Sequence, residues 1–171
     1  AIWALGEIAV AMGADSRAFA AMAVPPMSAV VEDEMLIESD EPQAQNMRDN
    51  AAIAIGRLGM VCPAEVAPMV GEILDDWLRL IANVDDGTEK EHAYCGLCFM
   101  IKASPATFVR EFRHVVHAFL CWRVQRPSPQ LRDMMRQIVV SFKEQAGDRW
   151  PQFLASLNEG AQPLLAQAFG V

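Results

Sequence analysis

Apolar side chains recur along the chain with the spacing of an α-helix. One stripe with a period of 3.6 residues runs through residues 64–81, with acidic and basic side chains on the other side. Two further stripes of the same kind begin near residues 105 and 129. The apolar members of the first stripe are Val66, Val70, Ile73, Leu74, Trp77, Leu78 and Ile81. The pattern predicts amphipathic helices, and no segment requires a strand.

Short polar signals indicate where several of these helices begin. Ser104-Pro105 and Ser128-Pro129 each place an N-cap residue before a proline at the first helical position. Thr88, followed three residues later by Glu91, is the pattern of a capping box. Together with the stripes, these signals predict a helix over residues 1–13, helix pairs over about 16–60, 63–102 and 105–145, and a capping pair over 148–169. The helices of the three pairs are expected over about 16–37 and 44–60, 63–82 and 88–102, and 105–122 and 129–145.

A helix pair with one apolar face cannot close a core alone, so we expect successive pairs to stack in an open row. The predicted fold class is all-α: an α-α superhelix, or HEAT-repeat solenoid, of antiparallel helix pairs stacked in a right-handed array. Short links at Cys62-Pro63 and Ser104-Pro105 join the pairs, and loops near residues 39–42, 84–87 and 123–127 join helices within a pair.

An internal repeat supports this interpretation. "IWALGEIAVAMG", "AIAIGRLGMVCP" and "YCGLCFMIKASP" align so that Trp3, Ile53 and Cys95 are equivalent, at spacings of about 50 and about 42 residues. The second spacing is typical of two-helix HEAT or armadillo units. We attribute the longer first spacing to extra loop within residues 23–45, and we expect Pro25-Pro26 and Pro68 to kink their helices.

Composition limits the kinds of partner. The chain has 171 residues, is 53% apolar and carries a formal net charge of −8. This charge argues against direct nucleic-acid binding and suits basic partners. The longest uncharged run, residues 18–31, is shorter than a membrane span and is interrupted by prolines. Because the first residues already read as an apolar helix, we expect the chain to be the tail of a longer polypeptide.

Two cysteines and two histidines have spacings that invite a zinc interpretation. Cys95 and Cys98 have zinc-finger spacing, and His114 and His117 follow. The cysteines, however, lie within one continuous apolar helix without the turn that brings two thiolates together. We therefore expect reduced, buried thiols of an intracellular protein and no metal or other cofactor. No phosphate loop, nucleophile elbow or HExxH motif is present, so we expect no enzyme activity.

Trp3 is the main candidate for a binding residue. The other tryptophans, Trp77, Trp122 and Trp150, lie on or beside apolar stripes and are expected to pack in the core. Equivalent positions of stacked units lie about 10 Å apart, so Trp3 and Ile53 would be neighbours on the concave helices. They are either ordinary core or an apolar anchor in an acidic groove.

Four segments carry a resemblance to a known family. They are "AIWALGEIAVAMG", "DNAAIAIGRLGMVCPAEVAPM", "LRDMMRQIVVSFKEQAGDRWPQF" and the closing "LAQAFGV". They resemble, in the same order, the C-terminal HEAT repeats of the transportins, karyopherin-beta nuclear import receptors for cargoes with proline-tyrosine nuclear localization signals. The resemblance runs from Ala1 to Val171 and weakens over residues 20–45.

The resemblance implies a role in nuclear import. Trp3 and Ile53 match two apolar cargo-binding positions of that family, and the cargo signals are basic overall. The Ran GTPase and nucleoporins would bind repeats upstream of this chain, and the whole receptor would shuttle between cytoplasm and nucleus. The alternative is a HEAT-repeat scaffold that binds another protein through its convex side.

Overall fold

The computed structural model describes residues 1–122 and 127–171, and all regular elements in these ranges are helices. The predicted loop over residues 123–127 lies, except for Pro127, outside the described residues. In chain order the helices are α1 (Ile2–Met12), η1 (Gly13–Ser16), α2 (Arg17–Glu32), α3 (Glu34–Ile37), α4 (Pro42–Val61), α5 (Pro63–Met69), α6 (Leu74–Asn83), α7 (Thr88–Ala103), α8 (Pro105–Phe108), α9 (Phe112–Leu120), α10 (Pro129–Ala146), η2 (Gly147–Arg149), α11 (Trp150–Ser156) and α12 (Ala161–Phe169).

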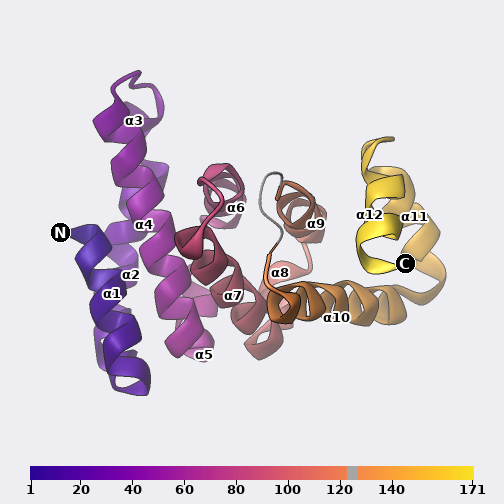
Figure 1. The fold of residues 1–171 in the computed structure, drawn as a ribbon, viewed down its shortest axis with the longest axis horizontal. Helices are drawn as coiled ribbons and strands as arrows, with labels where there is room; N and C mark the ends of the chain where they lie inside the picture. The colour runs from indigo at the N-terminus through magenta and orange to yellow at the C-terminus, as the bar shows by residue number, and fades with distance from the viewer. Residues whose placement is uncertain (123–126) are drawn as a thin grey trace.

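The helices form an open row that runs from one end of the molecule to the other (Figure 1), with the two chain ends at opposite sides. Helices α1, α4, α7 and α10 contact one another in sequence and make one layer. A second layer is made by α2, by α5 and α6, and by α9, which likewise contact one another in order. The chain is thus an all-α HEAT-repeat solenoid, as predicted.

Three details differ from the prediction. Helix α2 continues through Pro25 and Pro26 to Glu32, so these prolines are not in a loop. Burial of Val24, Met27 and Val31 on its core side stabilises α2 against the missing backbone donors. The helix predicted over residues 63–82 is divided into α5 and α6, because Pro68 removes a backbone donor just before the break. The helix predicted over 105–122 is likewise divided, into α8 and α9.

The helix-start signals have mixed outcomes. The Ser128 side chain accepts a hydrogen bond from the Leu131 backbone N–H, which confirms it as a cap. Ser104 occupies the N-cap position of α8, but its hydroxyl contacts the Thr107 hydroxyl instead of capping. The capping box at residues 88–91 is wrong: Gly87 is the N-cap of α7, and the Glu91 carboxylate accepts a hydrogen bond from the Ser128 backbone N–H.

Helix α4 is the centre of the part of the molecule that holds the candidate site. It lies between α1 and α7 (Figure 1) and also packs on α2, α5 and α6. At the crossing with α7, a Cβ built on Gly96 would overlap the backbone carbonyl of Gly56, and one on Gly56 would lie 2.5 Å from the Cα of Ala93. Glycine at these two positions lets the helices meet backbone to backbone.

Three tryptophans occupy the positions expected for packing residues. Trp77 is fully buried, and its indole N–H donates to the Ala52 carbonyl oxygen at 2.9 Å. Trp150 is buried beside Phe153, and Trp122 is half-buried against Tyr94. In the described part of the chain, no helix combines the length and apolar character that crossing a bilayer requires.

Candidate functional site

The Trp3 side chain lies across the surface of α4. Trp3 is 47% exposed, and its indole Nε1 donates a hydrogen bond to Glu89 Oε1 at 3.2 Å. Trp3 is on α1 and Glu89 is in the first turn of α7, while α4 lies between those helices. The hydrogen bond therefore spans α4. The indole is thus placed on the face shared by α1, α4 and α7, which we call the inner face.

Arg57 of α4 connects the three helices beneath the indole. Its side chain is almost completely buried; Nη2 lies 2.6 Å from Glu7 Oε1, and Nε donates to His92 Nδ1 at 3.3 Å. The guanidinium carbon lies 5.8 Å from the centroid of the Trp3 ring, a distance at which a cation and an aromatic ring attract each other. One side chain of α4 thus contacts two residues of α1 and one of α7, and these contacts fix the position of Trp3.

Local sequence explains how Arg57 fits. A Cβ built on Gly6 would lie 2.9 Å from Arg57 Cδ and 3.1 Å from the Ala54 Cα. The absence of a side chain at Gly6 therefore provides the space that the arginine side chain occupies between α1 and α4. Arg57 Nη1 is buried and has no hydrogen-bond partner in the structure. One hydrogen-bond donor of the guanidinium is therefore left without an acceptor.

The pKa of His92 is lowered from its ordinary value. Burial, together with the positive charge of Arg57, lowers the pKa of His92, and the nearby carboxylates of Glu7, Glu91 and Glu89 only partly oppose this. Its Nδ1 accepts the hydrogen bond from Arg57, and only the neutral imidazole has such a free lone pair. Near neutral pH, His92 is therefore an uncharged acceptor that holds Arg57 in place.

Ile53 is placed differently from Trp3. It lies one helical turn before Arg57 on α4, but it is only 6% exposed and does not belong to the contiguous core cluster. Trp3 is therefore the more accessible of the two predicted cargo-binding residues, and the role of both stays a prediction.

The inner face is acidic around the indole. Glu7 and Glu89 contact the Trp3 and Arg57 cluster directly, and Asp49 lies one turn before Ile53 on α4. Burial raises the pKa of the Asp49 carboxyl, and the negative charge of Asp85 adds to this effect. A hydrogen bond from Gln45 and the charge of Arg48 act in the opposite direction. An apolar ring surrounded by carboxylates suits a ligand that combines an apolar side chain with basic ones.

The residues of the zinc interpretation are not assembled. Cys95 and Cys98 both lie on α7, where burial raises the pKa of the Cys95 thiol to about 11 and that of Cys98 further. His114 Nδ1 lies 2.9 Å from carboxylate oxygens of both Asp75 and Glu111. Over the two described ranges, no group of three or more His, Cys, Asp or Glu side chains has an arrangement that could hold a metal ion.

Sequence reasoning missed four residues of the cluster: Glu7, Arg57, Glu89 and His92. Only Arg57 carries a visible signal, since it is a lone charge within the apolar run "AIAIGRLGM" and a buried charge requires a partner. The partners of Arg57 and Trp3 come from helices 35 and 86 residues away along the chain. No local pattern identifies such contacts.

Comparison with known proteins finds relatives along the whole length of the chain. It is 34% identical over 172 aligned residues to Transportin-1 of Mus musculus and equally to that of Homo sapiens, in alignments that cover all of this chain. It is 30% identical over 141 residues to Importin subunit beta-2 of Schizosaccharomyces pombe, with 81% of this chain covered. The chain spans only 18% of the length of the Transportin-1 proteins and 14% of the yeast protein. No family model matches it.

Proposed function

Over its whole length this chain is homologous to one segment of the transportins, and from that premise we propose that it is part of a nuclear import receptor. In this proposal the inner face binds basic nuclear localization signals of the proline-tyrosine type. The observation that carries the proposal is the exposed Trp3 indole, held among carboxylates by Glu89 and Arg57. The function is binding without catalysis, and it uses no cofactor.

Each part of the cluster has a role in this proposal. An apolar side chain of an extended signal peptide packs on the exposed face of the Trp3 ring. Covering about 100 to 200 Å² of apolar surface contributes about 2.5 to 5 kcal/mol before the peptide's ordering entropy is subtracted. Basic side chains of the signal interact with the carboxylates of Glu7, Glu89 and Asp49, which mainly raises the association rate and makes binding sensitive to salt.

Ile53 has a supporting role in this model. Because it is almost covered in the free chain, it contributes little new buried area when a peptide binds. Instead it fills the space on α4 one turn from Arg57. We propose that Trp3 is the cargo contact and that Ile53 borders the contact.

The remaining parts of the proposal concern the whole receptor. The Ran GTPase and nucleoporins bind repeats other than those described here, and the receptor shuttles between cytoplasm and nucleus. The homology to transportins and importin beta-2 supports these parts of the proposal.

The test compares two exposed apolar residues of the same helix. Trp3 is 47% and Ile8 is 48% exposed, both on α1. A fluorescently labelled basic peptide with a proline-tyrosine signal is titrated with the 171-residue chain and its variants. We expect Trp3→Ala to weaken binding by about 1 to 3 kcal/mol. We expect Ile8→Ala to leave it unchanged, because five residues along an α-helix turn a side chain about 140° away from that of Trp3.

Circular dichroism during urea unfolding shows whether each variant stays folded. An unchanged peptide affinity for folded Trp3→Ala would refute the inner face as the binding site. Equal losses for both variants would instead indicate general apolar adhesion along α1.

A further inference from the structure

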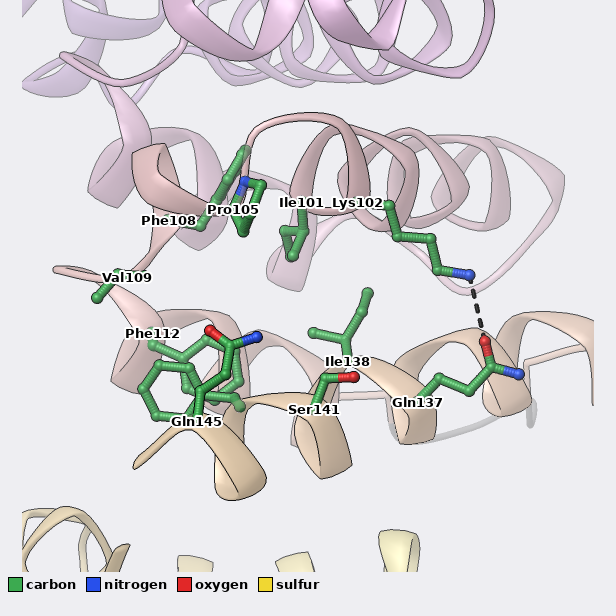
Figure 2. Close-up of a pocket in the computed structure, with 11 residues that line it drawn as sticks. Ile101, Lys102, Pro105, Phe108, Val109, Phe112, Gln137, Ile138, Ser141 and Gln145 are labelled. Atoms are coloured by element: carbon green, nitrogen blue, oxygen red, sulfur yellow. Dashed lines mark hydrogen bonds between the residues drawn. The ribbon is translucent and has the colours of Figure 1, made fainter. Parts of the chain in front are cut away.

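A second candidate surface lies on the part of the solenoid nearer to the C-terminus. A groove of about 280 Å³ lies between the end of α7, α8, and α10 (Figure 2). Its floor is apolar and buried, and its rim carries polar side chains. The floor residues are Ile101, Phe108, Phe112 and Ile138, and the rim residues are Lys102, Gln137, Ser141 and Gln145.

The groove continues into an adjoining hollow of about 450 Å³. The two hollows share Val109, Phe142 and Gln145, and the second extends to Arg149 and Phe153. Val109 is 48% exposed, and the Phe142 ring stacks on Phe112 with 3.5 Å between ring centroids. The shared wall is therefore apolar, accessible and held in place by packing, which is the usual character of the centre of a docking surface.

The charge along this groove is opposite to that of the chain as a whole. Its charged lining residues are Lys102 and Arg149, and no carboxylate lines either hollow among the described residues. Lys102 Nζ donates to the neutral amide oxygen of Gln137 at 3.3 Å (Figure 2). Within the part of the chain that the structure describes, neither Lys102 nor Arg149 forms an ion pair. Although the chain as a whole has a net charge of −8, this groove therefore has a positively charged rim over an apolar floor.

We propose that this groove docks an extended segment of a partner protein in which a bulky apolar side chain is flanked by aspartate or glutamate residues. The apolar side chain packs against Val109 and Phe142, and the flanking carboxylates pair with Lys102 and Arg149. This ligand has the opposite charge to the one proposed for the inner face, where Glu7 and Glu89 surround Trp3. The groove therefore binds a different class of segment, and the proposal does not depend on the proposed function.

The experiment uses two labelled peptides and charge-reversal variants of the 171-residue chain. The probe has a central Leu-Phe-Leu triplet with two glutamates on each side, and the control peptide has lysines in place of the glutamates. Fluorescence anisotropy measures both affinities. We expect the glutamate peptide to bind, and we expect Lys102→Glu combined with Arg149→Glu to weaken it at least about fivefold, because each exposed ion pair contributes modestly.

A matched control separates this effect from a change in net charge. Arg132 is exposed on the same helix as Gln137 and lies outside the groove, so Arg132→Glu with a second remote reversal, Arg113→Glu, should change affinity less than twofold. Trp3→Ala should also leave the binding of this peptide unchanged, so failure of one proposal is distinguishable from failure of the other. Amide shifts in nuclear magnetic resonance spectra should map to residues 101–112 and 137–153.

Three results would overturn the proposal. They are a lysine peptide that binds as tightly as the glutamate peptide, equal losses for the groove and remote charge reversals, and absence of binding at millimolar peptide. Any of these would show that the apolar wall and its cations do not act together as a docking site.

Discussion

Replacing Gly96 by alanine tests whether the crossing of α4 and α7 depends on the absence of a side chain. A Cβ at residue 96 overlaps the backbone carbonyl of Gly56, and neither backbone can rotate away as a side chain would. Helix α7 must therefore move away from α4. Because α7 carries Glu89 and His92, the movement also disturbs the contacts that hold Trp3 and Arg57.

The magnitude follows from two opposing effects. Alanine in a helix interior is favoured over glycine by about 0.5 to 1 kcal/mol. Overpacking a well-packed core costs about 1 to 3 kcal/mol, and more where backbone must shift. Because Leu97 and Cys98, directly beside the crossing, are fully buried, we expect the upper part of that range. The net loss in the free energy of unfolding for Gly96→Ala is then about 2 kcal/mol.

Gly59→Ala is the matched control. It lies on α4 three residues after Gly56, and its new Cβ would meet the flexible end of the Met100 side chain at 2.8 Å. Since Met100 can adopt another rotamer, the helix-propensity gain should offset the cost, and stability should stay within about 1 kcal/mol of the parent. Urea unfolding followed by circular dichroism measures both variants. If Gly96→Ala were as stable as Gly59→Ala, the reasoning about a backbone contact would be wrong.

Two further predictions concern buried charge and protonation. Lys90→Met should reduce the free energy of unfolding by about 2 to 3 kcal/mol, because the buried Nζ of Lys90 donates to two backbone carbonyls at the end of α6 and to Asp86. Lys102 is exposed, so Lys102→Met should change the free energy of unfolding by less than about 0.5 kcal/mol. The same urea titration measures both variants. The folded-state pKa of His92 is lowered below its usual 6.5, so this imidazole binds a proton more readily in the unfolded chain than in the folded one. The free energy of unfolding should therefore fall as pH drops below about 6.5 and level off below the folded-state pKa. Urea midpoints between pH 8 and 5 should show this slope, and His92→Gln should reduce it; an unchanged slope would contradict the assigned contact with Arg57.

Much of the helical layout could be predicted from local patterns. The stripe over residues 129–145 and the Ser128-Pro129 signal place α10 to within one residue of its observed end, because both depend on residues close in sequence. A kink at Pro68 was expected, but the full break between α5 and α6 and the break within residues 105–122 were not. The first follows Pro68, but an apolar stripe by itself does not reveal that two shorter helices share it.

The course of α2 shows how packing overrides a local signal. Two consecutive prolines favour a break, yet α2 continues through them, with Met27 and Val31 buried on its core side. The free energy gained by burying these side chains depends on α4 and α5, which pack against α2. The residues of α2 alone therefore do not reveal how much this burial stabilises the helix.

The sequence alone determined that this chain is a row of stacked helix pairs, because the 3.6-residue period leaves each pair with an apolar face that only a neighbour can cover. It also pointed to Trp3. Only the tertiary structure decided that Trp3 is 47% exposed while Ile53 is 6% exposed, since the exposed fraction of each depends on helices that are distant along the chain. It also decided that Arg57 joins Glu7, His92 and the indole, because those contacts depend on how close three helices approach at Gly6, Gly56 and Gly96.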